Sequence, residues 1–183
     1  MDIRYSANQK DFKRYTTQEL REEFLMEKLF LPDDVTAMYS HVDRIVVMGA
    51  MPVRQTLHIE KNIDCWKNFG VRYFLERREL GIINIGGNGT VTADGDVFEL
   101  GHIEGLYLPM GTREVLLGAK NPDNPPKFYM CSVPAHKPCP ATYIPFGKAI
   151  HRDQGTEEAA NARTINQFIH PDVLETCQLS MGC

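Results

Sequence analysis

Three closely spaced glycines, Gly86, Gly87 and Gly89, are the first candidates for chemistry, because glycine-rich loops can hold phosphate groups. A dinucleotide-binding loop needs a G-x-G-x-x-G pattern that leads into a helix. Gly87 and Gly89 begin that pattern, but Thr92 stands where the last glycine should be, and "TVTA" favours a strand. No G-x-x-x-x-G-K-[ST] loop occurs either. The spacing argues against nucleotide chemistry and predicts a turn or bulge in which a glycine adopts positive φ.

Histidine, a common metal ligand, occurs six times, but its spacing does not indicate a metal site. No H-x-H or H-E-x-x-H pair is present. We expect ordinary surface or hydrogen-bonded residues at all six positions: His41, His58, His102, His136, His151 and His170. His41 has the strongest functional claim, because Asp43 would share its strand face and could orient its ring. The five cysteines include no C-x-x-C pair and are expected to be reduced, small buried residues.

Composition is that of an ordinary globular protein: 183 residues, 43% hydrophobic, with a net charge of -4. This charge gives no general attraction to nucleic acid or anionic membranes, so neither partner is expected. The basic pair Arg77 and Arg78 is flanked by Glu76 and Glu79, so its charge is locally neutralised. The N-terminus is polar, and the longest apolar run, 45–53, is too short to cross a bilayer. We therefore expect a cytoplasmic location.

The elements that position these residues are predicted to be mostly strands. One helix is indicated by a capping box at Thr16 to Glu19, with Pro32 closing the segment. Asp94 and Gly95 separate two alternating segments and predict a tight hairpin. Strands are predicted at 35–40, 44–49, 71–76, 81–86, 89–93, 96–100, 104–109, 113–119 and 127–132. Many short strands separated by turns are typical of an all-β sandwich or barrel.

Changes in composition divide the chain into three parts. Residues 1–133 carry the helix and the strands, and are predicted to form one β-barrel domain. Residues 134–160 are rich in proline and polar residues without clear periodicity, which indicates a linker or long connection. Residues 161–183 regain a strand-like pattern and are expected to begin a second domain.

Two motifs make the barrel resemble a cupin, a jelly-roll β-barrel. Glu79, six further residues and Gly86 match the end of the first cupin motif, G-x5-H-x-H-x(3,4)-E-x6-G. Pro109 and Gly111 match the second motif, P-x-G-x2-H, but Glu114 stands in place of its histidine. In metal-binding cupins these positions converge on one ion inside the barrel. Here only Glu79 remains of the four ligands, so this barrel is expected to hold no metal.

The first two ligand positions depend on the spacer before Glu79. The longer spacer places Arg72 and Phe74 there, and the shorter one places Tyr73 and Leu75. With the longer spacer, Arg72 would point inward and neutralise Glu79 and Glu114 in place of the lost metal. With the shorter spacer, Arg72 would point to solvent. Strand alternation alone does not decide between the two.

Several long blocks together resemble the 5-keto-4-deoxyuronate isomerase family: "YSHVDRIVV", "VRYFLERRELGIINIGG", "ELGHIEGLY", "ARTIN" and "PDVLETCQLSMG". The resemblance covers nearly the whole chain. It implies a cytoplasmic, zinc-dependent enzyme with two cupin domains, usually a hexamer, that acts in pectin and uronate breakdown. Such an enzyme interconverts 4-deoxy-L-threo-5-hexosulose uronate and 3-deoxy-D-glycero-2,5-hexodiulosonate.

One departure from the family limits what this chain is expected to do. The family's zinc ligands belong to the second cupin, and no residue here matches them. We therefore expect the chain to correspond to the N-terminal two-thirds of the enzyme, to bind no zinc and to be inactive alone. Five apolar side chains would then lack the surface that normally covers them: Ile165, Phe168, Ile169, Val173 and Leu174.

Among the family's roles, only recognition of the substrate's carboxylate can be assigned to residues of this chain. An arginine fork suits a carboxylate. Arg163, within "NARTIN", is the first candidate, and Arg78 is the second. Arg163 could equally form a salt bridge between domains. The proton-transfer residue is not identified. The alternative function is a non-catalytic cupin module for sugar-acid binding or assembly.

Overall fold

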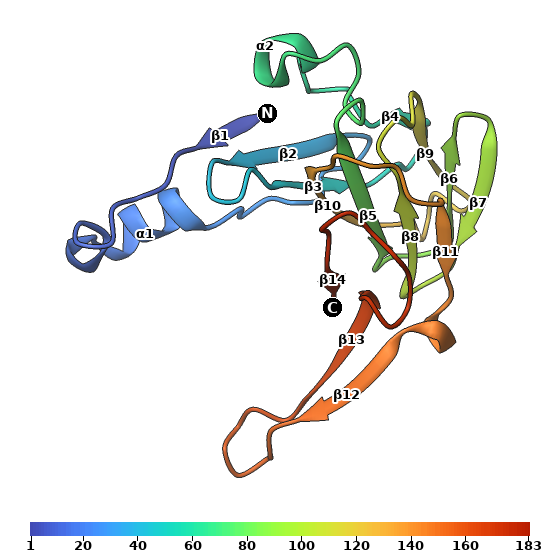
Figure 1. Cartoon of the computed structure of the whole chain (residues 1–183). Coiled ribbons are helices and arrows are strands. Elements are labelled where there is room, and N and C mark those ends of the chain that lie inside the picture. Colours follow the sequence, from blue (N-terminus) through green and yellow to red (C-terminus); the bar gives the residue numbers. More distant parts are fainter.

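The computed structural model describes residues 1–183 and is built mainly of short β-strands (Figure 1). Its helices are η1 (Phe12–Arg14), α1 (Thr17–Phe24), α2 (Cys65–Phe69) and η2 (Phe146–Lys148). Its strands are β1 (Asp2–Arg4), β2 (Val35–Ser40), β3 (Val46–Ala50), β4 (Leu57–His58), β5 (Arg78–Asn84), β6 (Gly89–Ala93), β7 (Asp96–Leu100), β8 (Glu104–Leu108), β9 (Val115–Ala119), β10 (Phe128–Pro134), β11 (Thr142–Ile144), β12 (Ile150–Gln154), β13 (Arg163–Ile169) and β14 (Met181–Gly182). The predicted all-β class with one N-terminal helix is confirmed.

Two sheets enclose the main core. The larger has the order β1-β2-β3-β10-β5-β8-β11, and the smaller has the order β4-β9-β6-β7. Neighbouring strands are antiparallel except β1 and β2. A cluster of 23 buried hydrophobic residues draws on both sheets, for example Met48 and Leu80 from one and Val91 and Leu117 from the other. This face-to-face arrangement fits the predicted cupin-type jelly roll, although the two sheets are not closed into one barrel.

Turn chemistry agrees with the sequence at one predicted corner and differs at the other. Asp94 and Gly95 both have positive φ (49° and 95°) and join β6 to β7, which confirms the hairpin. Gly86 and Gly87 do not have positive φ. Glycine is needed at these two positions because the neighbouring chain comes close. A Cβ on Gly86 would collide with the backbone of residues 125–127, and a Cβ on Gly87 would collide with the backbone of Asn124. The expectation of positive φ at these glycines is therefore wrong.

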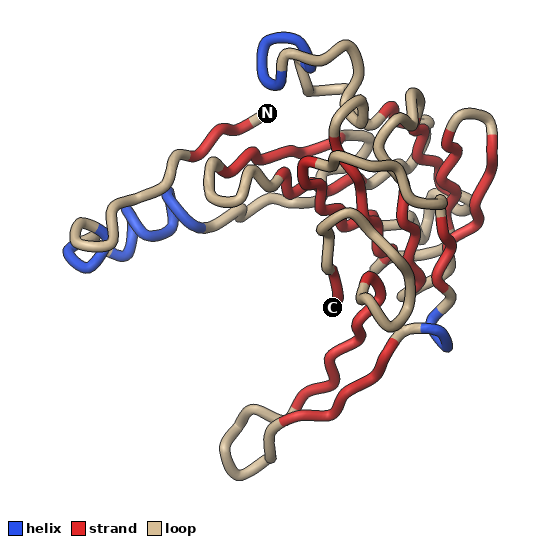
Figure 2. The backbone as a smooth tube through the Cα atoms, in the orientation of Figure 1, coloured by secondary structure: helices blue, strands red, loops and turns tan.

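Beyond β1, which pairs with β2, the chain forms an arm that carries η1 and α1 and projects from the sheets (Figures 1 and 2). Thr16 caps α1, and the reciprocal bonds between Thr16 and Glu19 confirm the capping box. The helix ends at Phe24, and none of its residues is buried. Neither α-helix combines the length and the apolar character that crossing a bilayer requires.

The C-terminal residues cover the outer face of the larger sheet. A second cluster of ten buried residues joins Ile83 and Tyr107 of that sheet to Phe168, Ile169 and others of the C-terminal segment. Glycine makes room for them: a Cβ on Gly81 would lie 2.5 Å from Ile169 Cδ1, and one on Gly105 2.9 Å from Phe168 Cδ1.

These contacts correct one expectation about the C-terminal side chains. Phe168 and Ile169 are only 0% and 1% exposed, so the prediction that they lack a covering surface is wrong. Val173 and Leu174 are partly buried against the same cluster. Residues 134–160 also contain β11 and β12, and β12 pairs with β13 in a hairpin that projects away from the sheets (Figure 2). The division into domains at 133 and 161 stays a prediction.

Candidate functional site

Strand β5 carries the two buried charges of the larger sheet, on opposite faces. Side chains alternate along a strand, so residues 78, 80, 82 and 84 face the smaller sheet while 79, 81 and 83 face outward. Arg78 is 5% exposed and Glu79 is 0% exposed. The two charges therefore do not pair with each other, and each must be satisfied by its own surroundings.

Arg78 is held by neutral groups alone. Its Nε donates to Ser132 Oγ (3.1 Å), and its Nη2 donates to the carbonyl oxygens of Ser132 and Arg44 (2.7 Å each). No hydrogen bond comes from Nη1, and no salt bridge of the chain includes Arg78. The only buried side-chain nitrogen or oxygen without a partner is Gln167 Oε1, so Arg78 Nη1 keeps access to solvent.

Aromatic rings complete the surroundings of this guanidinium. Its Cζ lies 5.2 Å from the ring centre of Phe69 and 5.9 Å from those of Tyr39 and Phe74. Ring faces attract a cation but do not neutralise its charge. Burial consequently lowers the pKa of Arg78 to about 10, which still leaves it charged at neutral pH. A buried cation without a counter-ion, with one nitrogen free, is suited to receive a carboxylate.

Glu79 fixes the C-terminal segment to the outer face of the sheet. Its Oε1 accepts from the backbone N–H groups of Gln178 (2.8 Å) and Leu179 (2.7 Å). Its Oε2 accepts from the Tyr107 hydroxyl (2.7 Å) and the Cys177 N–H (2.9 Å). Tyr107 is buried, and desolvation followed by its bond to Glu79 raises its pKa. All four contacts are structural, and none leaves the carboxylate free to bind an ion.

The proposed Arg72–Glu79–Glu114 network is wrong. The side chain of Arg72 is 80% exposed and pairs with Glu76 (2.9 Å), as the solvent-facing alternative held. Glu114 is exposed, and its N–H donates to Asp94 on the smaller sheet. No three His, Cys, Asp or Glu side chains of the chain lie close enough together to hold a metal ion. The residues at the cupin ligand positions therefore do not fit zinc.

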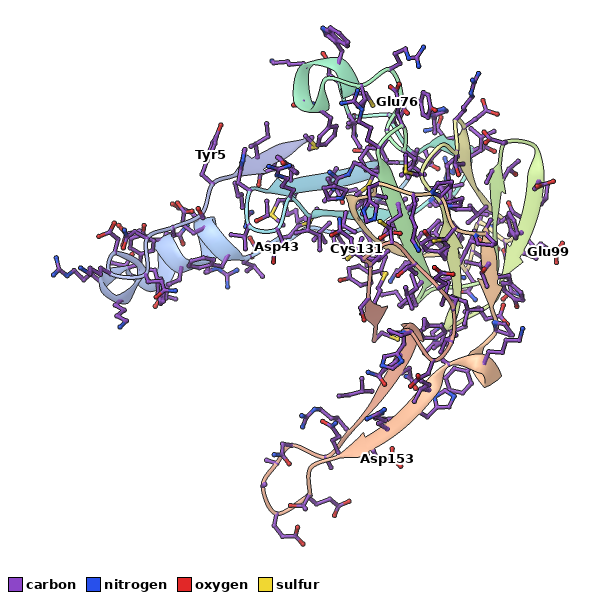
Figure 3. All side chains as sticks on the ribbon, viewed as in Figure 1. Tyr5, Asp43, Glu76, Glu99, Cys131 and Asp153 are labelled. Atoms are coloured by element: carbon purple, nitrogen blue, oxygen red, sulfur yellow. The ribbon has the colours of Figure 1, made fainter.

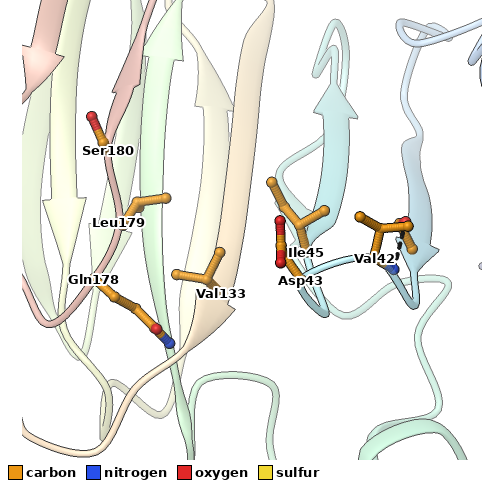
Figure 4. A pocket seen from close by; sticks show the side chains of 8 residues that line it. Val42, Asp43, Ile45, Val133, Gln178, Leu179 and Ser180 are labelled. Atoms are coloured by element: carbon orange, nitrogen blue, oxygen red, sulfur yellow. Dashed lines mark hydrogen bonds between the residues drawn. The ribbon is translucent and has the colours of Figure 1, made fainter.

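A groove of 530 Å³ lies beside the β2–β3 turn, on the outer face of the larger sheet (Figure 4). It runs between that turn and the C-terminal segment, and its polar lining comes from Ser40, Asp43, Gln178 and Ser180. Asp43 and Arg44 both have φ of 54°, which turns the chain sharply and directs the Arg44 carbonyl to Arg78. The turn therefore borders the groove on one face of the sheet and accepts a hydrogen bond from Arg78 on the other.

The other predicted residues lie elsewhere. Arg163 is exposed at the start of β13, where it donates to Asn161 O (2.9 Å) and Gln154 Oε1 (3.2 Å). It belongs to the projecting hairpin that also carries Asp153 (Figure 3), and no contact joins it to Arg78. The ring of His41 stacks on Tyr5, with centroids 4.4 Å apart, and no hydrogen bond joins it to Asp43.

One pair of reactive side chains was not predicted. Cys177 Sγ lies 3.0 Å from His136 Nδ1, although 41 residues separate them. No short motif marks such a pair, because only the packing of the C-terminal segment brings the two together. The five cysteines form no disulfide.

Comparison with known proteins adds the family. The sequence model of the KduI/IolB family matches residues 35–183. The chain is 47% identical over 182 residues to 4-deoxy-L-threo-5-hexosulose-uronate ketol-isomerases of Enterobacter sp. (strain 638) and Escherichia coli (strain SMS-3-5 / SECEC). Each match covers 100% of this chain, and the chain spans 65% of the length of these curated relatives.

A solved structure shares the fold. An IolB-like protein from Salmonella typhimurium LT2 superposes with a TM-score of 0.50 at 16% identity, over 72% of this chain and 47% of the other. The family match spans every strand of both sheets except β1, and includes the C-terminal segment. The chain belongs to the KduI/IolB family.

Proposed function

We propose that this chain serves the 4-deoxy-L-threo-5-hexosulose-uronate ketol-isomerase reaction, by providing a cupin scaffold and a binding site for the carboxylate of the substrate. The observation that carries the proposal is the 47% identity over the whole chain to curated isomerases of that name. The reaction interconverts 4-deoxy-L-threo-5-hexosulose uronate and 3-deoxy-D-glycero-2,5-hexodiulosonate. It is an intramolecular oxidoreduction in which a proton moves between two carbons through an enediol.

Arg78 is the residue of this chain best suited to the substrate's carboxylate. Its charge is buried without a counter-ion, and its Nη1 has no protein partner. Burying a cation alone is costly, and a bound carboxylate would offset that cost with a charge-assisted hydrogen bond. Arg163, the other candidate, already donates to two groups on its own hairpin in an exposed position. Arg78 is therefore the first candidate and Arg163 the second, in reverse of the sequence-based order.

Zinc, which the resemblance implies, has no suitable ligands among residues 1–183. In this proposal the ion would be held by residues outside this chain, so no step of the reaction is assigned to a metal here. The proposal also includes a cytoplasmic location, a role in pectin and uronate breakdown, a small-molecule uronate as the binding partner, and a homo-hexameric assembly.

A second candidate function is a non-catalytic cupin module that binds a sugar acid. The Arg78 surroundings favour it, because they could bind a carboxylate without any catalytic group nearby. The two functions differ in turnover. An isomerase part would support conversion of the uronate once the rest of the enzyme is present, whereas the module would bind a uronate without converting it.

A chimera tests both. Residues 1–183 are fused to the part of the Enterobacter isomerase that follows its matched region, and conversion of the hexosulose uronate is measured beside residues 1–183 alone. We expect turnover by the chimera only. Arg78→Met should raise KM about tenfold or more with little change in kcat, as expected for lost substrate binding. The matched control is Arg72→Met, which removes an exposed arginine.

Two results would count against these assignments. A folded, zinc-loaded chimera without turnover would contradict the isomerase proposal. Equal KM values for the Arg78→Met and Arg72→Met chimeras would exclude Arg78 from carboxylate binding. Should residues 1–183 alone bind D-galacturonate but not D-galactose while the chimera stays inactive, the binding module would be favoured.

A further inference from the structure

A second chemically competent group lies on the outer face of the larger sheet, apart from Arg78. Cys177 Sγ is 3.0 Å from Nδ1 of His136 and 3.8 Å from Nε2. The backbone N–H of His136 also points to Cys177 Sγ, at 3.3 Å. His136 is exposed and Cys177 is partly exposed, so small molecules can reach the sulfur. The thiol thus faces a proton acceptor and a hydrogen-bond donor together.

The surrounding contacts hold this pair in place from both sides. The Cys177 N–H donates to Glu79 Oε2 (2.9 Å), within the bonds that fix the C-terminal segment. Lys137 and Glu175, the neighbours of the pair in sequence, form a salt bridge of 2.6 Å. The side-chain amide of Gln178 donates to the carbonyl of Pro134. Residues 134–137 and 175–178 are therefore joined by four contacts: this salt bridge, this amide bond and the two contacts of His136 with the sulfur. Rigid support of this kind is what a reactive site requires.

Charged side chains of both signs lie near the pair. Lys137 follows His136 in the sequence, and its ammonium pairs with Glu175, which raises the pKa of Lys137. Glu79 contributes a negative charge, but its oxygens are occupied by four donors. The imidazole of His136 is the one group in direct contact that can take the thiol proton.

We propose that Cys177 and His136 form a reactive thiol site, modified covalently by small uncharged electrophiles such as hydrogen peroxide. A thiolate is the nucleophilic form of cysteine, and a histidine within hydrogen-bond distance can generate it. This inference is independent of the isomerase proposal, because it uses no residue assigned to substrate binding.

With hydrogen peroxide the step balances as follows. His136 takes the thiol proton, the Cys177 sulfur attacks one peroxide oxygen, and the O–O bond breaks. The sulfur is oxidised to sulfenic acid, and the peroxide is reduced. The leaving hydroxide takes the proton from the imidazolium and departs as water. With iodoacetamide the same thiolate forms a C–S bond, and iodide leaves.

The chain supplies its own reference thiol. Cys65, Cys131 and Cys139 are buried, and only Cys177 and Cys183 are open to solvent. Cys183 has no histidine partner, and partial desolvation raises the pKa of its thiol. Comparing the two thiols within one molecule removes differences in reagent concentration, pH and protein stability.

The experiment treats residues 1–183 with iodoacetamide at about pH 7 and follows each cysteine by peptide mass spectrometry. We expect Cys177 to react about tenfold faster than Cys183. His136→Gln should remove about nine-tenths of the Cys177 rate and leave that of Cys183 unchanged. The matched control is His102→Gln, which removes a different exposed histidine. After hydrogen peroxide treatment, dimedone should label Cys177 alone.

Two outcomes would overturn the proposal. One is a Cys177 rate no greater than that of Cys183 in the wild-type chain. The other is a folded His136→Gln chain, judged by circular dichroism, whose Cys177 rate is unchanged. If that variant does not fold, His136→Asn can keep a hydrogen bond to the sulfur but cannot take its proton, and it should show the same loss.

Discussion

Replacing Glu79 by glutamine should detach the C-terminal segment from the sheet more readily than any exposed change. The carboxylate accepts four hydrogen bonds, two at each oxygen, from Tyr107, Cys177, Gln178 and Leu179. Glutamine has nearly the same shape, but one of its oxygens becomes an NH2 group, which donates. The substitution therefore removes acceptor capacity and charge without opening a cavity.

The magnitude follows from counting these bonds. If the new NH2 group faces Tyr107, the hydroxyl can rotate and accept a hydrogen bond from it. A backbone N–H can only donate, so it cannot pair with the NH2 group. At least one buried N–H then loses its partner, which costs about 1–3 kcal/mol. The two bonds at the remaining oxygen change from charged to neutral, which costs about 1 kcal/mol each. We expect Glu79→Gln to lower the free energy of unfolding by about 3–5 kcal/mol.

Urea denaturation followed by circular dichroism measures this change, with the slope m checked for constancy. Glu99→Gln is the matched control, because Glu99 is exposed and forms only a surface salt bridge with Lys120. The Glu99→Gln chain should unfold at the same urea concentration as the wild-type chain. Amide hydrogen exchange provides a local readout. In the Glu79 variant the amides of residues 177–179 should exchange faster, while those of β6 and β7 should keep their relative protection.

A Glu79→Gln chain that unfolds at the same urea concentration as the Glu99→Gln chain would refute this reasoning. It would mean that the four bonds in the folded chain stabilise it no more than hydrogen bonds to water stabilise the same groups in the unfolded chain. Loss of stability without faster exchange at residues 177–179 would also contradict it, because the effect would then arise outside the C-terminal segment.

Three further predictions concern packing, ionisation and an exposed ion pair. Gly81→Ala places a Cβ 2.5 Å from Ile169 and should cost about 1–3 kcal/mol in urea denaturation, whereas Gly147→Ala meets nothing within 4 Å and should be neutral. In an alkaline titration at 295 nm, Tyr107 and Tyr129 should ionise only as the fold is lost. Burial raises their pKa, so stability falls once the pH exceeds the ordinary tyrosine value of about 10. Arg72→Met should not change the melting temperature measurably, because its ion pair is exposed.

The local features of the fold could be predicted from the sequence because they depend on near neighbours. The capping box at Thr16 and the Asp94–Gly95 turn act within four residues, and the strands on either side alternate regularly. The predicted strand at 71–76 is wrong. Gly70 ends helix α2 with φ of 65°, and residues 71–76 that follow form bends and turns without strand pairing.

The site could be predicted less well, because it depends on contacts between distant residues. The motif located Glu79 but placed it inside the barrel, whereas the structure has it on the outer face of β5, surrounded by backbone N–H groups. Arg78 was named as a candidate, yet its lack of a counter-ion became visible only once its neighbours were known. The glycine at position 81 is explained in the same way, by side chains about one hundred residues later.

The separation between Glu79 and the backbone groups that it binds, 98 to 100 residues, also has a consequence for the order of folding. The two sheets can pair before residues 163–182 have been synthesised, and until then the outer face with Ile83 and Tyr107 is bare. Contacts this distant in sequence form slowly, since a large loop must close first. A transient species with paired sheets and an uncovered apolar face should therefore precede the native state. Its tendency to self-associate, and not the stability of the finished fold, would then set the yield of refolding at high protein concentration.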